Sequence, residues 1–389
     1  MSKLSFENTE ISFQSKSNSE LQQSFWLFKL VGSPVIVKIG SSLMQFALLM
    51  RLPIKSIIKA TIFKQFCGGE SIADCKESIK NLETYNVKTI LDYSVEGKHS
   101  EDDFNAVTKE ITRTIERAKN DTSIPFAVFK VSGLGALELL EKISSNKLLT
   151  VKETNDFDLL KERVNKICQT AFDLDVKVFI DAEESWIQDA IDDIATAMMQ
   201  KFNSKKAIVY NTLQLYRWDR LAFLKQLFAD AENNNYYLGL KLVRGAYMEK
   251  ERDRASTYGY PSPIQKNKNQ CDQDYDLALK FCVEHSNKIA ICAGTHNEKS
   301  SIYLTELMAK FNISNNDERI YFSQLLGMSD HISFNLAHEG YNVVKYMPYG
   351  PVKEVMPYLI RRAQENTSIS GQTGRELNLI IKEKQRRRI

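Results

Sequence analysis

The sequence predicts an α/β protein built as a (βα)8 TIM barrel with an N-terminal helical segment. From about residue 83 onward, short apolar segments alternate with longer amphipathic ones, giving about eight strand–helix units. The apolar segments are continuous, which is typical of parallel strands covered on both sides. Polar residues stand at the end of each expected strand, which is where barrel active sites are built.

Taken in order, the elements begin with a polar stretch at residues 1–25, which predicts a loose arm, and a helical stretch at residues 35–82. The eight expected strands end near Tyr93, Gly133, Glu183, Tyr216, Tyr247, Asn297, Met328 and Gly350. Helix-period segments separate them, for example residues 153–174 and 187–203. We therefore expect an N-terminal arm and helical segment (1–82), the barrel domain (83–370) and a basic C-terminal tail (371–389).

The polar strand ends are the first indication of a site. They are Asp92, Lys130, Asp181, Gln214, Lys241, Thr295, His296, Gln324 and Tyr346. Because the carboxyl ends of parallel strands meet at one face of a barrel, these residues predict an active site there.

Composition excludes several classes of protein. The net charge of +3 over 389 residues is too small to indicate a nucleic-acid binder. The six cysteines form no CxxC pair and predict reduced, buried thiols, and the five dispersed histidines predict no metal site. No secretory signal is expected, and the most apolar stretch, residues 31–52, is interrupted by Pro34, Lys38 and Arg51, which argues against a membrane span.

Two adjacent arginines, Arg361 and Arg362, follow a Gly350-Pro351 turn on an amphipathic segment, with Glu365 one helical turn behind. Adjacent guanidinium groups repel each other unless an anion lies between them, and Glu365 can hold one of them. The pair is suited to binding a carboxylate; the alternative is a solvated basic helix face.

Familiar catalytic motifs are missing from the sequence. It contains no GxSxG elbow, HExxH helix or P-loop, and Gly133-Leu134-Gly135 lacks the third glycine of a dinucleotide fingerprint. The remaining groups suit an anionic small substrate beside a polar cofactor.

Several segments closely resemble proline dehydrogenases. They are KLVRGAY (241–247), THN (295–297), YMPYG (346–350), LIRRAQEN (359–366), FCGGE (66–70), IDAEE (180–184) and YFSQLLGM (321–328). The resemblance runs from about residue 63 to residue 367, with the motifs in the family's order. It implies an FAD-dependent stand-alone enzyme that oxidises L-proline to Δ1-pyrroline-5-carboxylate and passes the electrons to a quinone, the first step of proline catabolism to glutamate.

The resemblance also implies roles around the substrate. Arg361 and Arg362 would bind the proline carboxylate, with Glu96 as a gate; an exposed loop acid is the alternative for Glu96. Lys130 would lie beside the substrate, and Asp181 would hold Lys130 or another cation. The apolar walls around the pyrrolidine ring would be Tyr247, Leu325 and Tyr346, and the size of Tyr346 favours proline over hydroxyproline.

The cofactor residues follow from the same resemblance. Lys241 would lie near flavin N5, where many relatives have arginine, and would take part in catalysis with Asp181. Further flavin contacts are implied for Ala182, Gln214, Val243, Arg244, Gly245, Ala246, Thr295, His296, Asn297, Gln324 and Glu365.

Two other functions remain open from the residues. A lysine-dependent lyase or aldolase would use Lys130 or Lys241 as a nucleophile. A non-catalytic amino-acid binder would keep proline affinity without a flavin. We expect a cytoplasmic enzyme, peripheral at the inner face of the membrane through its N-terminal helices or basic tail, with a mitochondrial matrix location as the alternative; the oligomeric state stays open.

Overall fold

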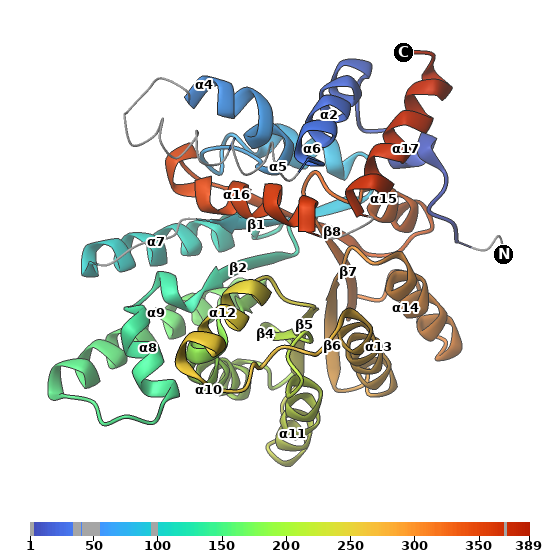
Figure 1. Ribbon diagram of the computed structural model, residues 1–389. Helices are drawn as coiled ribbons and strands as arrows, with labels where there is room; N and C mark the ends of the chain where they lie inside the picture. Colours follow the sequence, from blue (N-terminus) through green and yellow to red (C-terminus); the bar gives the residue numbers. More distant parts are fainter. Residues whose placement is uncertain (1–3, 34–39, 41–54, 95–99, 369–371) are drawn as a thin grey trace. The chain divides into compact units, whose positions relative to one another are not determined.

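The computed structural model describes residues 4–33, 40, 55–94, 100–368 and 372–389. Its eight strands form a closed barrel in sequential order, with parallel pairing, as the sequence predicts (Figure 1). The strands are β1 (Val87–Tyr93), β2 (Phe126–Lys130), β3 (Lys177–Asp181), β4 (Val209–Gln214), β5 (Leu238–Val243), β6 (Ile289–Gly294), β7 (Ile320–Leu325) and β8 (Val343–Tyr349).

The helices before, between and after the strands are of very different lengths. Those up to β4 are α1 (Thr9–Ser12), α2 (Asn18–Val31), α4 (Lys55–Ile58), the π-helical η1 (Lys59–Phe63), α5 (Lys64–Phe66), α6 (Lys76–Glu83), α7 (Glu101–Ala118), the 3₁₀ turn η2 (Val131–Gly133), α8 (Leu137–Ser144), α9 (Val151–Asp173) and α10 (Ser185–Phe202). The later ones are α11 (Arg220–Asn233), α12 (Met248–Tyr258), α13 (Lys268–Glu284), α14 (Glu298–Lys310), α15 (Asp330–His338), α16 (Val352–Ser368) and α17 (Gln372–Arg387).

The chain divides into two compact units, which are described separately. The central unit is Gly97–Ser323, and the terminal unit combines Met1–Glu96 with Gln324–Ile389. The three predicted domain boundaries are not the boundaries of these units, and they stay a prediction.

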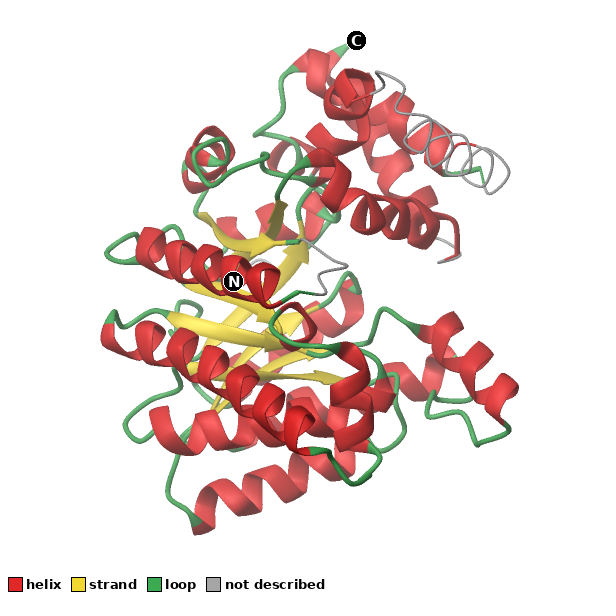
Figure 2. Ribbon diagram, turned by 90° about the vertical axis from the view of Figure 1, so that its left-hand side faces the viewer, coloured by secondary structure: helices red, strands yellow, loops and turns green. Residues whose placement is uncertain are grey.

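In the central unit, strands β2 to β7 pair in parallel with their neighbours. Figure 2 shows the strands in yellow with helices in red alongside them. The strands of this unit are almost entirely buried, and the burial includes polar residues such as Asn211 and Gln214 of β4 and Lys241 of β5. Its helices are amphipathic: α7 buries Phe104, Ile111 and Ile115 and keeps its acidic first turn exposed.

The terminal unit is built from both ends of the chain. β1 and β8 pair in parallel from Val87–Val343 to Tyr93–Tyr349. A hydrophobic cluster joins the N-terminal helices to α17 through Phe13, Leu21, Phe28, Leu379 and Ile380.

The ends of the chain therefore differ from the predicted loose arm and tail. Residues 1–25 contain α1 and most of α2, which begins with a capping box between Ser17 and Glu20. The basic segment after residue 371 forms α17, in which Leu379 and Ile380 are buried. The apolar residues of these stretches do not indicate their partners, because each helix is stabilised by residues from the other end of the chain.

Several predicted strands extend too far at their carboxyl ends. β2 ends at Lys130 instead of Gly133, β4 at Gln214 instead of Tyr216, and β5 at Val243 instead of Tyr247. After β2 and β4 the apolar pattern continues because Val131, Leu215 and Tyr216 in the following turns are also buried, whereas the turn after β5 is partly exposed. Among the residues that the structure describes, no helix is both long and apolar enough to cross a membrane.

Candidate active site

The predicted site residues fall in both units. The central unit contains Lys130, Asp181, Ala182, Gln214, Lys241, Val243, Arg244, Gly245, Ala246, Tyr247, Thr295, His296 and Asn297, and the terminal unit contains Gln324, Leu325, Tyr346, Arg361 and Arg362. Glu96 and the side chain of Glu365 lie outside the described part of the chain.

The central unit brings Lys241 and Asp181 together as a buried ion pair. Lys241 Nζ lies 2.6 Å from Asp181 Oδ1, and the two residues are only 7% and 8% exposed. Thr212 Oγ1 lies 3.4 Å from the same carboxylate oxygen, and the ammonium lies 5.4 Å from the centre of the Phe179 ring. Asp181 therefore holds the cation of β5, which is one of the two outcomes that the sequence left open.

A second buried carboxylate, Glu183, follows Asp181 on the same strand end. Its Oε1 accepts a hydrogen bond from the Ser132 N–H at 3.0 Å, and its Oε2 accepts one from the Ser132 hydroxyl. Burial raises the pKa of Glu183 to about 7, against the opposing effects of Lys130 and the Ser132 hydrogen bonds. Glu183 is not among the predicted site residues, because nothing in the IDAEE segment indicates which of its acids is buried among hydrogen-bond donors.

A polar network in the core fixes the backbone at Glu183. Gln188 accepts the Glu183 N–H at 2.8 Å and donates to Asp192 at 2.9 Å. Asp192 in turn lies 2.6 Å from Arg220, and Gln214 Nε2 donates to the Glu183 carbonyl at 2.6 Å. The predicted cofactor residue Gln214 is therefore tied to the strand end that carries Asp181.

The turn after β5 passes close to an aromatic ring. Gly245 has φ of +139°, and a Cβ there would lie 2.4 Å from the ring of Tyr216. Glycine is required at this position by both its backbone conformation and this contact. Gly245 and Ala246 are exposed, so their backbone is open to a ligand.

Arg244 links the end of β5 to the helices that follow. Its guanidinium donates to Asp272 Oδ1 at 2.7 Å, Thr295 Oγ1 at 2.7 Å and Ser300 Oγ at 2.9 Å. It also stacks over Tyr275, with 4.3 Å between Cζ and the ring centre. These contacts give Arg244 a structural role in orienting Thr295, in addition to the predicted cofactor contact.

Thr295, His296 and Asn297 follow β6 directly. The Thr295 N–H donates to the Ser323 carbonyl at 3.1 Å, which ties it to β7. Asn297 caps α14 by accepting from the N–H groups of Lys299 and Ser300. His296 is half-buried. The THN segment thus forms a helix start that is compatible with the predicted cofactor role.

In the terminal unit, the FCGGE segment holds the end of β8. The Gly68 N–H donates to the Pro348 carbonyl at 2.9 Å, and the Gly350 N–H donates to the Gly69 carbonyl at 3.1 Å. A Cβ on Gly68 would lie 2.4 Å from Met347 Sδ, so a larger residue would push the two segments apart. The close contact with β8 therefore accounts for the two glycines of the FCGGE segment.

The same segment fixes the start of the arginine helix. Glu70 Oε1 accepts from the Val352 N–H at 3.3 Å, at the first residue of α16. Lys55 and Lys59 lie 2.9 and 2.7 Å from the Glu70 carboxylate, and their hydrogen bonds lower its pKa to about 2.

The two arginines differ in burial. Arg362 is 7% exposed and lies over the Tyr358 ring, with 5.2 Å between Cζ and the ring centre, whereas Arg361 is half-buried. A helix face with a buried arginine contradicts the alternative of a fully solvated basic face. Leu325 packs against the hydrophobic cluster that includes Val355 and Leu359 of α16, so this predicted wall residue and the arginine helix are neighbours.

Tyr346 and Gln324 are buried in the terminal unit, at 7% and 2% exposure. The Tyr346 carbonyl accepts from the Leu326 N–H at 2.9 Å, which places Tyr346 beside the turn that begins at Leu325.

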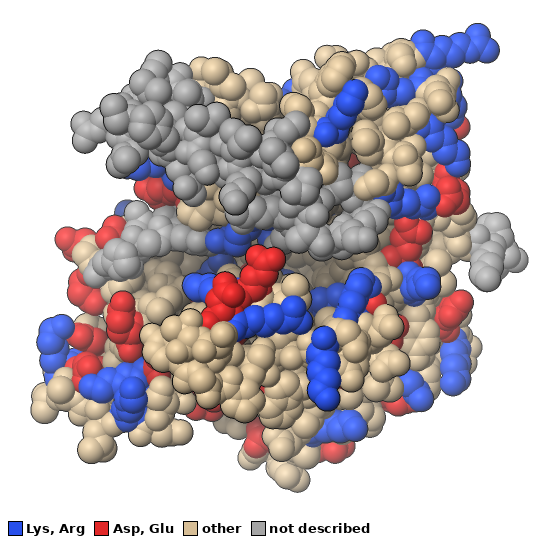
Figure 3. Space-filling view, in the orientation of Figure 1, with Lys and Arg blue, Asp and Glu red and all other residues tan. Residues whose placement is uncertain are grey.

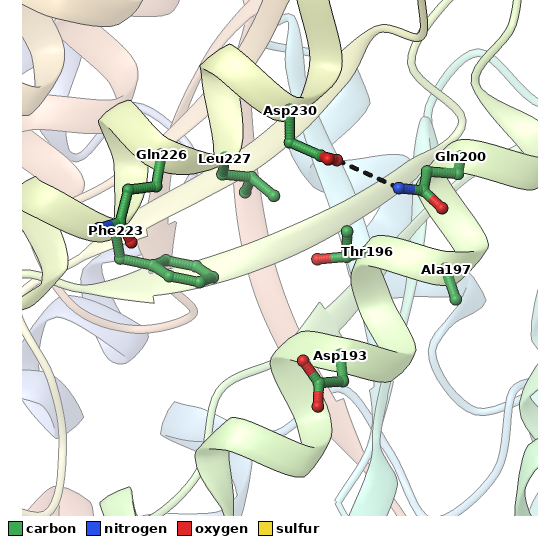
Figure 4. A pocket seen from close by; sticks show the side chains of 8 residues that line it. All are labelled: Asp193, Thr196, Ala197, Gln200, Phe223, Gln226, Leu227 and Asp230. Atoms are coloured by element: carbon green, nitrogen blue, oxygen red, sulfur yellow. Dashed lines mark hydrogen bonds between the residues drawn. The ribbon is translucent and has the colours of Figure 1, made fainter. Parts of the chain in front are cut away.

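A surface hollow elsewhere in the central unit is lined by residues other than the predicted site residues. It has a volume of about 340 Å³ and lies between α10 and α11, where Gln200 donates to Asp230 at 3.1 Å (Figure 4). It is lined by Asp193, Thr196, Ala197, Gln200, Phe223, Gln226, Leu227 and Asp230. None of the predicted site residues lines it, so it is not part of the candidate site. Within the described residues, no group of three or more metal-ligating side chains is found.

Comparison with known proteins identifies the family. The model of the family described as proline dehydrogenase matches residues 75–375. "Proline dehydrogenase 1, mitochondrial" of Dictyostelium discoideum is 31% identical over 96% of this chain and 74% of its own length. "Hydroxyproline dehydrogenase" of Xenopus laevis is 28% identical over 96% of this chain and 88% of its own length.

A solved structure agrees with the fold. Proline utilization A from Bdellovibrio bacteriovorus, inactivated by N-propargylglycine, superposes with a TM-score of 0.74 at 21% identity over 95% of this chain. This chain spans 40% of that longer protein, and at 21% identity the likeness shows the fold alone. On the extent of the family match and the identity to full-length relatives, the chain belongs to the proline dehydrogenase family.

Proposed function

We propose that this protein oxidises L-proline to Δ1-pyrroline-5-carboxylate with FAD as its cofactor and a quinone as the electron acceptor. The observation that carries the proposal is the buried Lys241–Asp181 pair on the barrel strands of a chain that belongs to the proline dehydrogenase family.

The donor set of the central unit supports FAD. It offers an ammonium at Lys241, the amide of Gln214, the hydroxyl of Thr295 and the imidazole of His296, all on β4–β6 or directly after a strand. The exposed backbone at Gly245 and Ala246 has room for a ligand. When bound, FAD would accept the hydride from the ring carbon next to the proline nitrogen.

The protein's own residues would bind and orient the substrate. Arg361 and Arg362 would bind the proline carboxylate, and the partial burial of the pair strengthens such charged hydrogen bonds. Lys241, held by Asp181 at 2.6 Å, would place a positive charge beside the bound cofactor, where negative charge would develop when the hydride is accepted. Lys130, whose charge opposes the rise in the pKa of Glu183, would lie beside the substrate.

Proline is favoured over hydroxyproline as the substrate. Tyr346 is buried, and a large side chain in this place would crowd a ring hydroxyl. Because one relative is named a hydroxyproline dehydrogenase, the ratio of kcat/KM for the two substrates is the direct test; a ratio below one would reverse the assignment.

Contact with a membrane, where quinones are dissolved, is part of the proposal. Lys and Arg side chains gather over α17 at the upper right of Figure 3. Several of them are partly neutralised, because Arg375 and Lys382 pair with Glu7, and Arg386 and Arg387 pair with Glu383. Flotation of the full-length protein with anionic liposomes tests this contact, and protein that stays at the bottom of the gradient would refute it. The relatives named mitochondrial favour the matrix alternative for localisation.

The test of the function is a visible spectrum of the purified protein before and after L-proline is added without oxygen. A flavin spectrum that bleaches on addition is the expected result. A flavin spectrum that does not change when proline is added would refute proline as the substrate. The absence of a flavin spectrum after reconstitution with FAD would refute FAD as the cofactor. The lyase alternative predicts instead a colourless protein and a substrate adduct trapped by borohydride.

A further inference from the structure

The turn that joins β7 to α15 has an unusual backbone. It runs from Leu325 to Asp330 and contains two residues with left-handed φ, Gly327 at +74° and Ser329 at +51°. A non-glycine residue in this region is strained by about 1 kcal/mol or more, so the surrounding structure has to hold it in place.

A buried lysine on β8 holds the turn from one side. Lys345 is 0% exposed; its Nζ donates to the Met328 carbonyl at 2.6 Å and lies 2.8 Å from Asp330 Oδ1. It also lies 3.4 Å from the Leu325 carbonyl. The lysine therefore bridges the beginning and the end of the turn.

The N-terminal helices hold the middle of the turn. Gln65 Nε2 donates to the Gly327 carbonyl at 2.9 Å, and Gln65 Oε1 accepts from Ser24 of α2 at 3.1 Å. A Cβ on Gly327 would lie 2.0 Å from the Gln65 carbonyl oxygen, so these segments are in direct contact.

The C-terminal helix α17 holds the strained residue itself. The carboxylate of Glu376, which is 3% exposed, accepts a hydrogen bond from the Ser329 N–H. Ser329 precedes the first turn of α15, in which Ser333 donates from Oγ to Gln324 Oε1 at 2.8 Å. Hydrogen bonds thus connect Glu376, through the start of α15, to Gln324 at the end of β7.

We propose that Glu376 is a positioning residue of the active site: it acts through Ser329 and Ser333 to fix Gln324 and Leu325. This inference rests on the proposed function and on the roles that the family resemblance implies, a cofactor contact for Gln324 and a place in the wall around proline for Leu325. Glu376 lies one residue beyond the part of the chain that the family model matches. A positioning role for Glu376 would give α17 a part in substrate binding as well as in stability.

The chain offers a matched control on the same helix. Glu383 is also on α17 with a fully buried side chain, but it pairs with Arg386 at 2.8 Å and Arg387 at 2.7 Å instead of the β7–α15 turn. Glu383→Ala removes a comparable carboxylate without touching the turn. Glu376→Gln keeps a carbonyl oxygen that can accept the Ser329 N–H.

The experiment compares the full-length FAD-loaded protein with Glu376→Ala, Glu376→Gln and Glu383→Ala by steady-state kinetics and by amide hydrogen exchange. We expect Glu376→Ala to raise KM for proline about fivefold or more and to speed exchange in residues 324–333, since the lost acceptor held that turn. Glu376→Gln and Glu383→Ala should keep KM within about twofold, whatever their effect on thermal stability.

The outcomes separate this inference from the proposed function. If the wild type does not oxidise proline, the proposed function fails, and exchange in residues 324–333 alone decides the positioning role. If the wild type is active but Glu376→Ala and Glu383→Ala behave alike, only this inference is overturned. Should Glu376→Ala fail to fold, Ser333→Ala tests the last link, and an unchanged KM in that variant overturns it.

Discussion

At the scale of single residues, the end of β3 contains two buried carboxylates in different surroundings. Asp181 lies 2.6 Å from the ammonium of Lys241, whereas Glu183 accepts hydrogen bonds from Ser132 and is held by burial at a pKa of about 7. One carboxylate fixes a cation, and the other titrates close to neutral pH.

Replacing Lys241 tests the first of these roles. Lys241→Met removes the cation beside Asp181, and we expect flavin reduction by proline to slow about 10²-fold, the usual effect of losing one preorganised charged group. Stopped-flow absorbance under anaerobic conditions measures this rate. Lys241→Arg, which keeps the charge, is the control; an unchanged rate in Lys241→Met would remove this residue from the mechanism.

Replacing Glu183 gives a prediction about stability and pH. The folded pKa of Glu183, about 7, is above its ordinary value of 4.5, so the folded protein binds the proton more tightly than the unfolded chain. The contribution of the protonated carboxyl to the free energy of unfolding is therefore fully present below pH 4.5 and is lost as the pH rises through 7. The full effect is on the order of 3 kcal/mol. Relative to the wild type, the melting temperature of Glu183→Gln should therefore rise between pH 5 and pH 8. Thermal unfolding across this range measures it, and a constant difference would contradict the raised pKa.

The sequence predicted these residues unevenly. The position of Lys241 and Asp181 near the ends of apolar strands was readable, but their pairing required the register of β3, β4 and β5. Glu183, Gln188 and Asp192 were missed because a buried polar network joins residues from different elements, and no periodicity within one segment reports it.

At the scale of elements, α16 depends on segments distant in the sequence. Its first N–H is bonded to Glu70, and the FCGGE segment holds the end of β8 that precedes it. These contacts set where the helix begins and hence where its arginines lie.

Substitution of the arginines tests this helix. Arg361→Ala or Arg362→Ala should raise KM for proline about 10²-fold, as expected when a buried charged hydrogen bond worth roughly 3 kcal/mol is lost. Steady-state kinetics in both variants measures it. Lys353→Ala, an exposed cation on the same helix, is the control and should leave KM unchanged. An unchanged KM in both arginine variants would refute a carboxylate site.

The strands and the terminal helices were predicted with very different success. Eight apolar segments gave the eight strands, because continuous hydrophobicity is a property of each strand alone. The helices α1, α2 and α17 were missed, because their apolar residues pack on residues from the opposite end of the chain, and neither end alone indicates its partner. The strained turn after β7 and its partners Lys345 and Glu376 likewise depend on contacts between distant segments.

At the scale of the whole molecule, the cysteines are uniformly protected. All six are free and buried, as the composition predicted. Burial raises the pKa of Cys75 and Cys292 to about 12 and that of Cys271 to about 11.

A thiol titration tests this arrangement. We expect the native protein to react with less than about one equivalent of an aromatic disulfide reagent, because thiolates are scarce and inaccessible. In guanidinium chloride all six thiols should react. Rapid reaction of two or more thiols in the native protein would contradict the burial.

The composition of the terminal unit has a consequence for biosynthesis. The central unit is one continuous stretch, so all of its residues have left the ribosome before the last part of the terminal unit has been synthesised. The terminal unit cannot be completed until α17 has been released, because β1 pairs with β8 and α2 packs against α17, and both partners are synthesised late. The apolar faces of the first helices are therefore exposed throughout translation, and chaperones that bind nascent chains have their longest opportunity at residues 9–31.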